Sequence, residues 1–107
     1  MSVEMPIVCT LGAGERSARL ASARALGERA LVGVEASGRR AVLRFRGEPE
    51  RVEAWVAAER ECCAFFTFGT ARSEQETVVE IEAPEGGEPL LRSLVAGIVA
   101  GWQGPLG

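Results

Sequence analysis

Two adjacent cysteines, Cys62 and Cys63, are the residues of this 107-residue chain whose types and spacing best suit chemistry. Neighbouring side chains leave a helix about 100° apart and leave a strand on opposite faces, so two adjacent thiols do not fill one core pocket. Glu59 comes four residues before Cys63, which places both side chains on the same face of a helix. The third thiol, Cys9, lies in a short apolar run, and we expect folding to bring it to the pair.

Three thiols and a carboxylate are a ligand set suited to a soft metal ion. Thiolates bind Zn(II), Cu(I) and related heavy metals, so the expected site contains Cys9, Cys62 and Cys63. Glu59 or water would complete it. The spacing is a weaker signal than two Cys-x-x-Cys pairs, because adjacent cysteines need an unusual backbone to direct both sulfurs at one ion.

Two other interpretations of the thiols stay open. In the first, the protein is a thiol redox protein. Consecutive Cα atoms are only about 3.8 Å apart and a disulfide usually spans about 4.4–6.8 Å, so the bond would join Cys9 to Cys62 or Cys63. In the second, the cysteines are small buried hydrophobes of a structural domain. A thiol near a helix C-terminus also meets the negative end of the helix dipole, which opposes its ionisation.

The sequence contains no histidine, which removes the usual general base and any Cys-His catalytic pair. This absence counts against a protease or an acyltransferase, and we expect a binding protein before an enzyme. Glu59 falls on the apolar stripe of its helix, and a carboxylate in such a place is costly unless it is paired. A functional role competes there with a structural one, namely a salt bridge to Arg44 or Arg46.

An α+β fold with the element order βαββαββα is expected to position these residues. The predicted elements are a strand at 7–11, a helix at 15–30, strands at 31–35 and 41–46, a helix from 49 to about 63, strands at 66–71 and 77–83, and a helix at 88–102. This order is typical of a two-layer sandwich with helices on one face of a mainly antiparallel sheet. A ferredoxin-like core is one way to build it.

Apolar side chains recur at helical spacing in all three predicted helices. The three stripes are Leu20, Ala23, Leu26 and Ala30; Val52, Trp55, Val56, Glu59, Cys63 and Phe66; and Leu90, Leu91, Leu94, Val95, Ile98, Val99 and Trp102. We expect the aromatic residues to belong to the core. The last stripe is broad, so it predicts either core packing or a homodimer interface.

Composition limits the class of protein. With 47% apolar and 25% charged residues, the chain suits a single globular domain over residues 1–107, with residues 1–5 and 103–107 loosely ordered. The net charge of −3 comes from interspersed signs, so neither nucleic acid nor a membrane is an expected partner. We find no signal peptide and no membrane span, and three cysteines suit a reducing compartment, which predicts a cytoplasmic protein.

Parts of the chain between residues 7 and 85 resemble a family of small bacterial proteins of unknown function. The matching segments are Ile7-Val8-Cys9-Thr10-Leu11, Leu43-Arg44-Phe45-Arg46 and Ala58-Glu59-Arg60-Glu61-Cys62-Cys63-Ala64. The last segment also resembles, more loosely, Cys-Cys-Pro-Phe domains associated with mercury and arsenic handling, with Ala64 in place of the proline. The resemblance implies a shared site of Cys9, Glu59, Cys62 and Cys63 and no established activity.

Overall fold

A computed structural model of the chain describes residues 13–100 and 102. The elements are α1 (Ala13–Ala30), β1 (Leu31–Ser37), β2 (Arg40–Arg46), α2 (Pro49–Cys62), β3 (Thr67–Arg72), β4 (Glu76–Glu82) and α3 (Glu88–Val99). This confirms the α+β class and the predicted order from the first helix onward. The predicted strand at 7–11 and the two loosely ordered ends lie outside the described residues. The last helix ends at Val99, three residues before the predicted boundary.

The four described strands form one antiparallel sheet in the order β1-β2-β4-β3. A two-residue turn joins β1 to β2, and Gly38 takes the positive φ of 58° that such a turn requires. In a ferredoxin-like core the N-terminal strand would lie between the strands here called β2 and β3. In this structure β4 occupies that place, so the described sheet follows a different topology.

The hydrophobic core lies on one face of this sheet. Ala41, Leu43 and Phe45 are fully buried. They alternate along β2 with Arg40, Val42, Arg44 and Arg46. Across the strand pair, Leu43 lies opposite Val79 and Ala41 lies opposite Ile81, so both strands direct their apolar residues to the same side. A sequence period of two therefore fixes which face the helices must cover.

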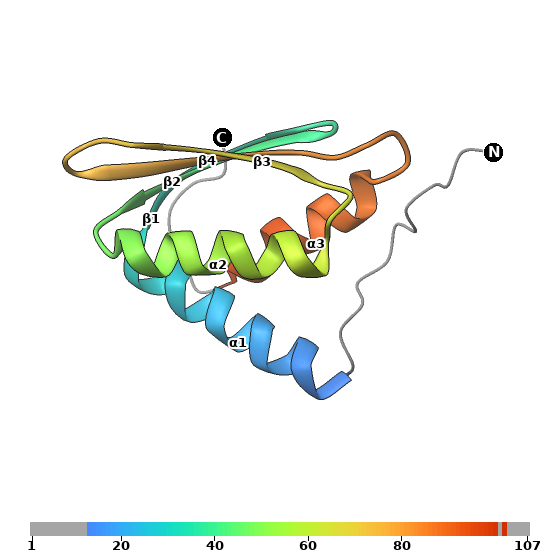
Figure 1. The fold of residues 1–107 in the computed structure, drawn as a ribbon, viewed down its shortest axis with the longest axis horizontal. Helices are drawn as coiled ribbons and strands as arrows, with labels where there is room; N and C mark the ends of the chain where they lie inside the picture. The colour runs from blue at the N-terminus through green and yellow to red at the C-terminus, as the bar shows by residue number, and fades with distance from the viewer. Residues whose placement is uncertain (1–12, 101, 103–107) are drawn as a thin grey trace.

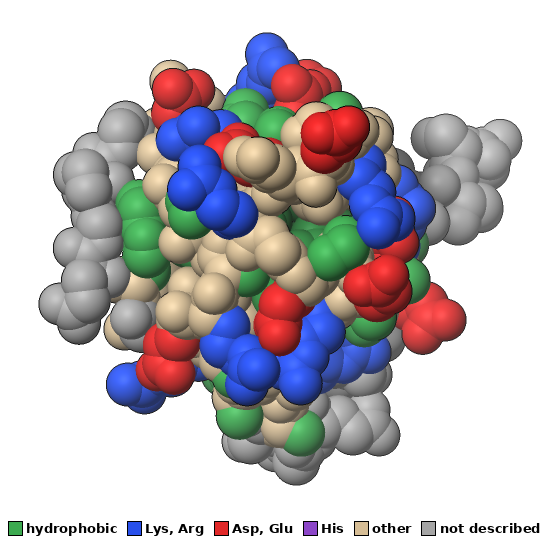
Figure 2. Space-filling model, turned by 90° about the vertical axis from the view of Figure 1, so that its left-hand side faces the viewer, with side chains coloured by type: hydrophobic (Ala, Val, Ile, Leu, Met, Phe, Trp, Pro, Cys, Tyr) green, Lys and Arg blue, Asp and Glu red, His purple; other side chains and the backbone are tan. Residues whose placement is uncertain are grey.

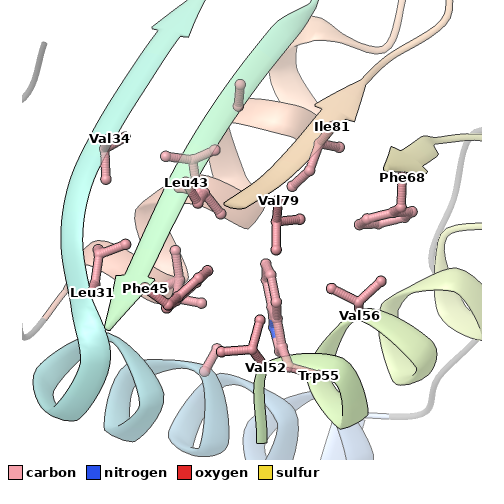
Figure 3. Close-up of a cluster of buried hydrophobic side chains, with 14 of the residues drawn as sticks. Leu31, Val34, Leu43, Phe45, Val52, Trp55, Val56, Phe68, Val79 and Ile81 are labelled. Atoms are coloured by element: carbon pink, nitrogen blue, oxygen red, sulfur yellow. The ribbon is translucent and has the colours of Figure 1, made fainter. Parts of the chain in front are cut away.

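All three helices lie on that side of the sheet, and α2 and α3 are the ones next to it (Figure 1). From α2, Val52, Trp55 and Val56 point toward the sheet (Figure 3), and the Trp55 ring lies 6.1 Å from the Phe45 ring between centroids. The prediction that the aromatic residues belong to the core is confirmed for Trp55, Phe66 and Phe68, which are buried, whereas Phe65 and Trp102 are partly buried against the core.

Helix α1 crosses beneath the other two helices and packs mainly against α3 (Figure 1). The crossing is close because Gly27 has no side chain: a Cβ there would overlap the backbone carbonyl of Ile98. Ala23 and Leu26 are buried, as predicted from the first stripe. Leu20 differs, since it is 57% exposed although it shares their helical spacing.

The opposite face of the sheet is polar. Arg40 of β2 pairs with Glu80 of β4 at 2.9 Å, and Arg46 pairs with Glu76 at 3.2 Å. Charges of both signs are also interspersed on the molecular face shown in Figure 2, as the sequence predicts. None of the described helices is long and apolar enough to cross a membrane.

Candidate functional site

The two adjacent cysteines straddle the end of α2. Cys62 is the last helical residue, and Cys63 leaves the helix with φ −122° and ψ 61° while its N–H still donates to the Glu59 carbonyl oxygen at 2.7 Å. This break in the helix turns the two side chains toward each other, and their Sγ atoms lie 3.7 Å apart. It is the unusual backbone that two neighbouring thiols need in order to face one point.

Glu59 forms a compact group with these two cysteines. Its Oε2 lies 4.0 Å from the Cys63 Sγ, and the ligand atoms of Glu59, Cys62 and Cys63 all lie within 4.8 Å of one another. The structure thus brings together three of the four residues predicted for the site. The fourth, Cys9, lies outside the described residues, so its contact with the pair stays a prediction.

Burial shapes the protonation of this group. Cys62 is buried and Cys63 is half-buried. Loss of water and the nearby Glu59 carboxylate raise the pKa of Cys63 to about 11, against a smaller opposing effect of the Arg19 guanidinium. Desolvation also raises the pKa of Glu59, and Arg19 again opposes the shift. Burial therefore favours the neutral forms of Cys63 and Glu59 over their charged forms.

The predicted salt bridge between Glu59 and a strand arginine is wrong. Arg44 and Arg46 lie on the polar face of the sheet and both pair with Glu76, at 3.8 and 3.2 Å. Helix α2 covers the other face, so neither guanidinium can reach Glu59. Among the described residues Glu59 has no ion pair, and the cation that influences its pKa is Arg19 of α1.

Glu59, Cys62 and Cys63 lie in the wall of a cavity of about 260 Å³ between the three helices. The wall is mostly apolar. Its described residues are Arg19, Leu20, Ala23, Trp55, Glu59, Cys62, Cys63, Phe65, Leu90, Ser93, Leu94 and Gly97. Leu20, the exposed member of the first helical stripe, therefore faces the cavity and not the core.

Two residues that line this cavity each carry a buried donor atom without a hydrogen-bond partner among the described residues. Arg19 Nη1 and Trp55 Nε1 are buried, and neither donates to an acceptor. Sequence reasoning missed both. Trp55 was correctly assigned to the core from its spacing, but spacing does not show whether an indole N–H finds an acceptor. Nothing in the sequence distinguishes Arg19 from the other arginines of the first helix.

Comparison with known proteins gives no match: no protein-family model, no curated protein and no solved structure is detectably similar to this chain. The geometry of the site must therefore carry the functional argument.

Proposed function

We propose that this protein, with its thiols reduced, binds a soft heavy-metal or metalloid ion. In this proposal Cys62 and Cys63 are the principal ligands, Cys9 supplies a third thiol, and Glu59 is an auxiliary ligand or hydrogen-bond acceptor. The protein would work in the cytoplasm, where a reducing environment keeps thiols available. Zn(II) or another thiophilic ion is the expected occupant.

The separation of the two sulfurs carries the proposal. In a tetrahedral site with metal–sulfur bonds of about 2.3 Å, two thiolate ligands lie roughly 3.8 Å apart. The Sγ atoms of Cys62 and Cys63 are 3.7 Å apart. In the reduced protein, one ion could bridge two sulfurs at this spacing, which arises from the break in α2 at Cys63.

The electrostatics favour a soft cation over a hard one. A half-buried thiol with a pKa of about 11 gives up its proton only to a ligand that bonds sulfur strongly, which hard cations such as Mg²⁺ do not. A bound cation also removes the repulsion between the Cys63 thiolate and the Glu59 carboxylate, which contributes to the raised pKa of Cys63.

Native mass spectrometry tests the proposal on reduced protein offered Zn(II), Hg(II) or As(III). We expect the unmodified chain to retain one ion and a Cys62→Ser/Cys63→Ser variant to retain none. Cys9→Ser should weaken retention if Cys9 is the third ligand. Glu59→Gln should weaken it less, and Glu61→Gln, an exposed acidic position on the same helix, is the matched control and should have no effect. If the unmodified chain retains no ion, the proposal is wrong.

A thiol redox role is the second candidate. The 3.7 Å between the two sulfurs would allow a disulfide from Cys9 to pass between Cys62 and Cys63. Against this, with a pKa of about 11, roughly one Cys63 thiol in 10⁴ is ionised at neutral pH, and the thiolate is the attacking species. Peptide mapping after peroxide treatment would decide: a defined disulfide from Cys9 in a protein that retains no metal would favour the redox role.

The third reading is a structural domain that dimerises through α3. Of the predicted α3 stripe, Leu91, Val95 and Ile98 are buried in the core, while Leu90, Leu94 and Val99 are partly buried. Core packing therefore already buries three of the seven stripe residues and covers the others in part. A concentration-dependent dimer in sedimentation, in a protein that neither binds metal nor forms a defined disulfide, would favour this reading.

A further inference from the structure

We propose that residues 7–11, the apolar segment just before α1, dock in the cavity between the three helices, and that a disulfide from Cys9 to Cys62 holds them there. The occupant of the cavity is then a segment of this chain and not a separate ligand. The inference accounts for how Cys9 would reach the proposed metal site, and it sets a redox condition on that site. The docking itself requires no metal.

The state of the cysteines carries the proposal. Cys62 is disulfide-bonded in this structure, whereas Cys63 is a free thiol. The sequence contains one further cysteine, Cys9. The two Cα atoms of a disulfide usually lie about 4.4–6.8 Å apart. Because Cys62 lines the cavity, a bond from Cys9 to Cys62 brings the neighbours of Cys9 to the cavity wall.

The cavity also offers an apolar surface for a segment to cover. Leu20 is the one large apolar side chain that is exposed among the described residues, at 57%. It lines the cavity together with the partly buried side chains of Phe65, Leu90 and Leu94. Removing such surface from water is favourable. The apolar residues of segment 7–11 supply a suitable cover.

The size of the cavity fits this segment. At about 30 Å³ for each non-hydrogen atom, 260 Å³ accommodates roughly nine atoms. In an extended segment alternate side chains project to the same side, so Ile7 and Leu11 would accompany Cys9 into the cavity. These three side chains together have about that number of atoms, so they match the volume.

The connection to α1 is long enough for this docking. Figure 1 shows that α1 begins at the end of the molecule where α2 ends, which is where Cys62 lies. Arg19 lines the same cavity as Cys62, and the helix rises about 9 Å from Ala13 to Arg19. The chain from Cys9 to Ala13 spans up to about 13 Å when extended. The segment can therefore turn back from the start of α1 to the cavity.

The disulfide and the metal site use the same sulfurs. Forming the bond joins the Sγ atoms of Cys9 and Cys62 and releases two protons and two electrons, which a low-molecular-weight disulfide takes up as it is reduced to two thiols. While the bond exists, neither sulfur is a thiolate ligand. Reduction returns both to the proposed site, and the apolar contacts of segment 7–11 keep Cys9 beside the pair. We expect the oxidised protein to bind Zn(II) at least tenfold more weakly than the reduced one.

Nuclear magnetic resonance of the metal-free full chain with ¹³C-labelled methyl groups tests the docking. We expect nuclear Overhauser contacts from Ile7 and Leu11 to Leu20 and Leu94, in the oxidised and in the reduced protein. A sample that mixes labelled and unlabelled chains separates contacts within one chain from contacts between two. If the contacts are absent, or arise only between two chains, the proposal is wrong.

Peptide mapping after equilibration with oxidised and reduced glutathione tests the bond. We expect Cys9 linked to Cys62, with Cys63 free to react with iodoacetamide, and any other pairing contradicts the proposal. Docking raises the effective concentration of the two thiols, so Leu11→Asp should lower the equilibrium constant for the bond at least tenfold. Val3→Asp, an equal change outside the segment, is the matched control and should leave it unchanged.

The Cys62→Ser/Cys63→Ser variant separates this inference from the proposed function. It can form neither the disulfide nor the metal site, yet the methyl contacts of Ile7 and Leu11 should persist in it. If they persist while the unmodified reduced chain retains no ion, the docking stands and the proposed function is wrong. If the unmodified chain retains an ion but shows no such contacts, the proposed function stands and the docking is wrong.

Discussion

Charged side chains on the two sides of the sheet differ in whether they are paired. On the polar side, Arg40 pairs with Glu80, and Arg44 and Arg46 both pair with Glu76. On the helical side, the half-buried Glu59 has no ion pair among the described residues, and buried donors of Arg19 and Trp55 lack acceptors.

This contrast separates stability from function. Buried polar groups are almost always satisfied in folded proteins, so unsatisfied donors on two residues that line one cavity call for an explanation. The two raised pKa values, those of Cys63 and Glu59, fall in that same cavity. Perturbed groups gathered in a cavity are typical of binding sites, whereas ion pairs on an open sheet contribute little beyond solubility.

We expect Gly27→Ala to cause the largest loss of stability, and on the helical side of the sheet only. The new Cβ would overlap the backbone carbonyl of Ile98, so α1 must move away from α3 and the cavity between the helices opens. We expect a loss of about 3 kcal/mol in the free energy of unfolding, measured by urea denaturation, because overpacking against backbone cannot be relieved by a rotamer change. The ion pairs of the sheet should persist in the folded fraction.

Gly69→Ala is the matched control for this substitution. Gly69 lies in β3 with open space around its Cα and no positive φ, so the change should cost nothing and would stabilise the fold slightly. Equal losses at both positions would show that the α1–α3 crossing is not the tight contact described above.

Much of the fold was predictable because its signals are local. The alternation in β2 and β4, the turn around Gly38 and the start of α2 at Pro49 all follow from neighbouring residues. The strand order was not predictable. Whether β4 or another strand lies beside β2 depends on contacts between segments far apart in the chain, which periodicity does not encode.

Only those site residues that are close together in the sequence could be predicted. Glu59, Cys62 and Cys63 lie within five residues, so their spacing suggested a group, and the structure brings them within reach of one ion. Arg19 comes from another helix and has no local signature. The salt bridge predicted for Glu59 failed for a reason that is local: the alternation in β2 places Arg44 on the face away from its apolar neighbours, and the helices cover the apolar face.

We expect the affinity for a metal ion to depend on pH. Below the pKa of Cys63, about 11, an entering ion must displace the proton of this thiol. Affinity should therefore rise at least tenfold for each pH unit between pH 6 and 8, measured by competition with a chelator of known pH dependence. Cys63→Ser should reduce that slope by one proton. An affinity independent of pH would contradict a thiolate ligand at Cys63.

Glu59→Gln should have a smaller effect on stability, and we expect it to stabilise the protein at high pH. Desolvation raises the pKa of Glu59 in the folded protein above its usual value of 4.5, so folding favours the protonated form. Below pH 4.5 the carboxyl is protonated in both states and the substitution should change little. As pH rises, the unfolded state ionises first and the native protein loses stability, so Glu59→Gln should raise the melting temperature at pH 8. The exposed Glu61→Gln should not, and a lower melting temperature for Glu59→Gln would mean that the carboxylate is paired after all.

Glu76→Gln is the counterpart on the polar face and should act in the opposite direction. It removes the partner of Arg46 at 3.2 Å and of Arg44 at 3.8 Å. Because both arginine side chains are more than half exposed, at 64% and 52%, water screens these pairs, and the expected loss is about 0.2–1 kcal/mol of unfolding free energy at pH 7. The loss should shrink in high salt. Glu74→Gln, an exposed change in the adjoining turn, is the control. Opposite changes in stability for Glu59→Gln and Glu76→Gln would establish that the carboxylate on the polar side of the sheet stabilises the fold and the one on the helical side destabilises it. A ligand bound on the helical side would compensate for that cost.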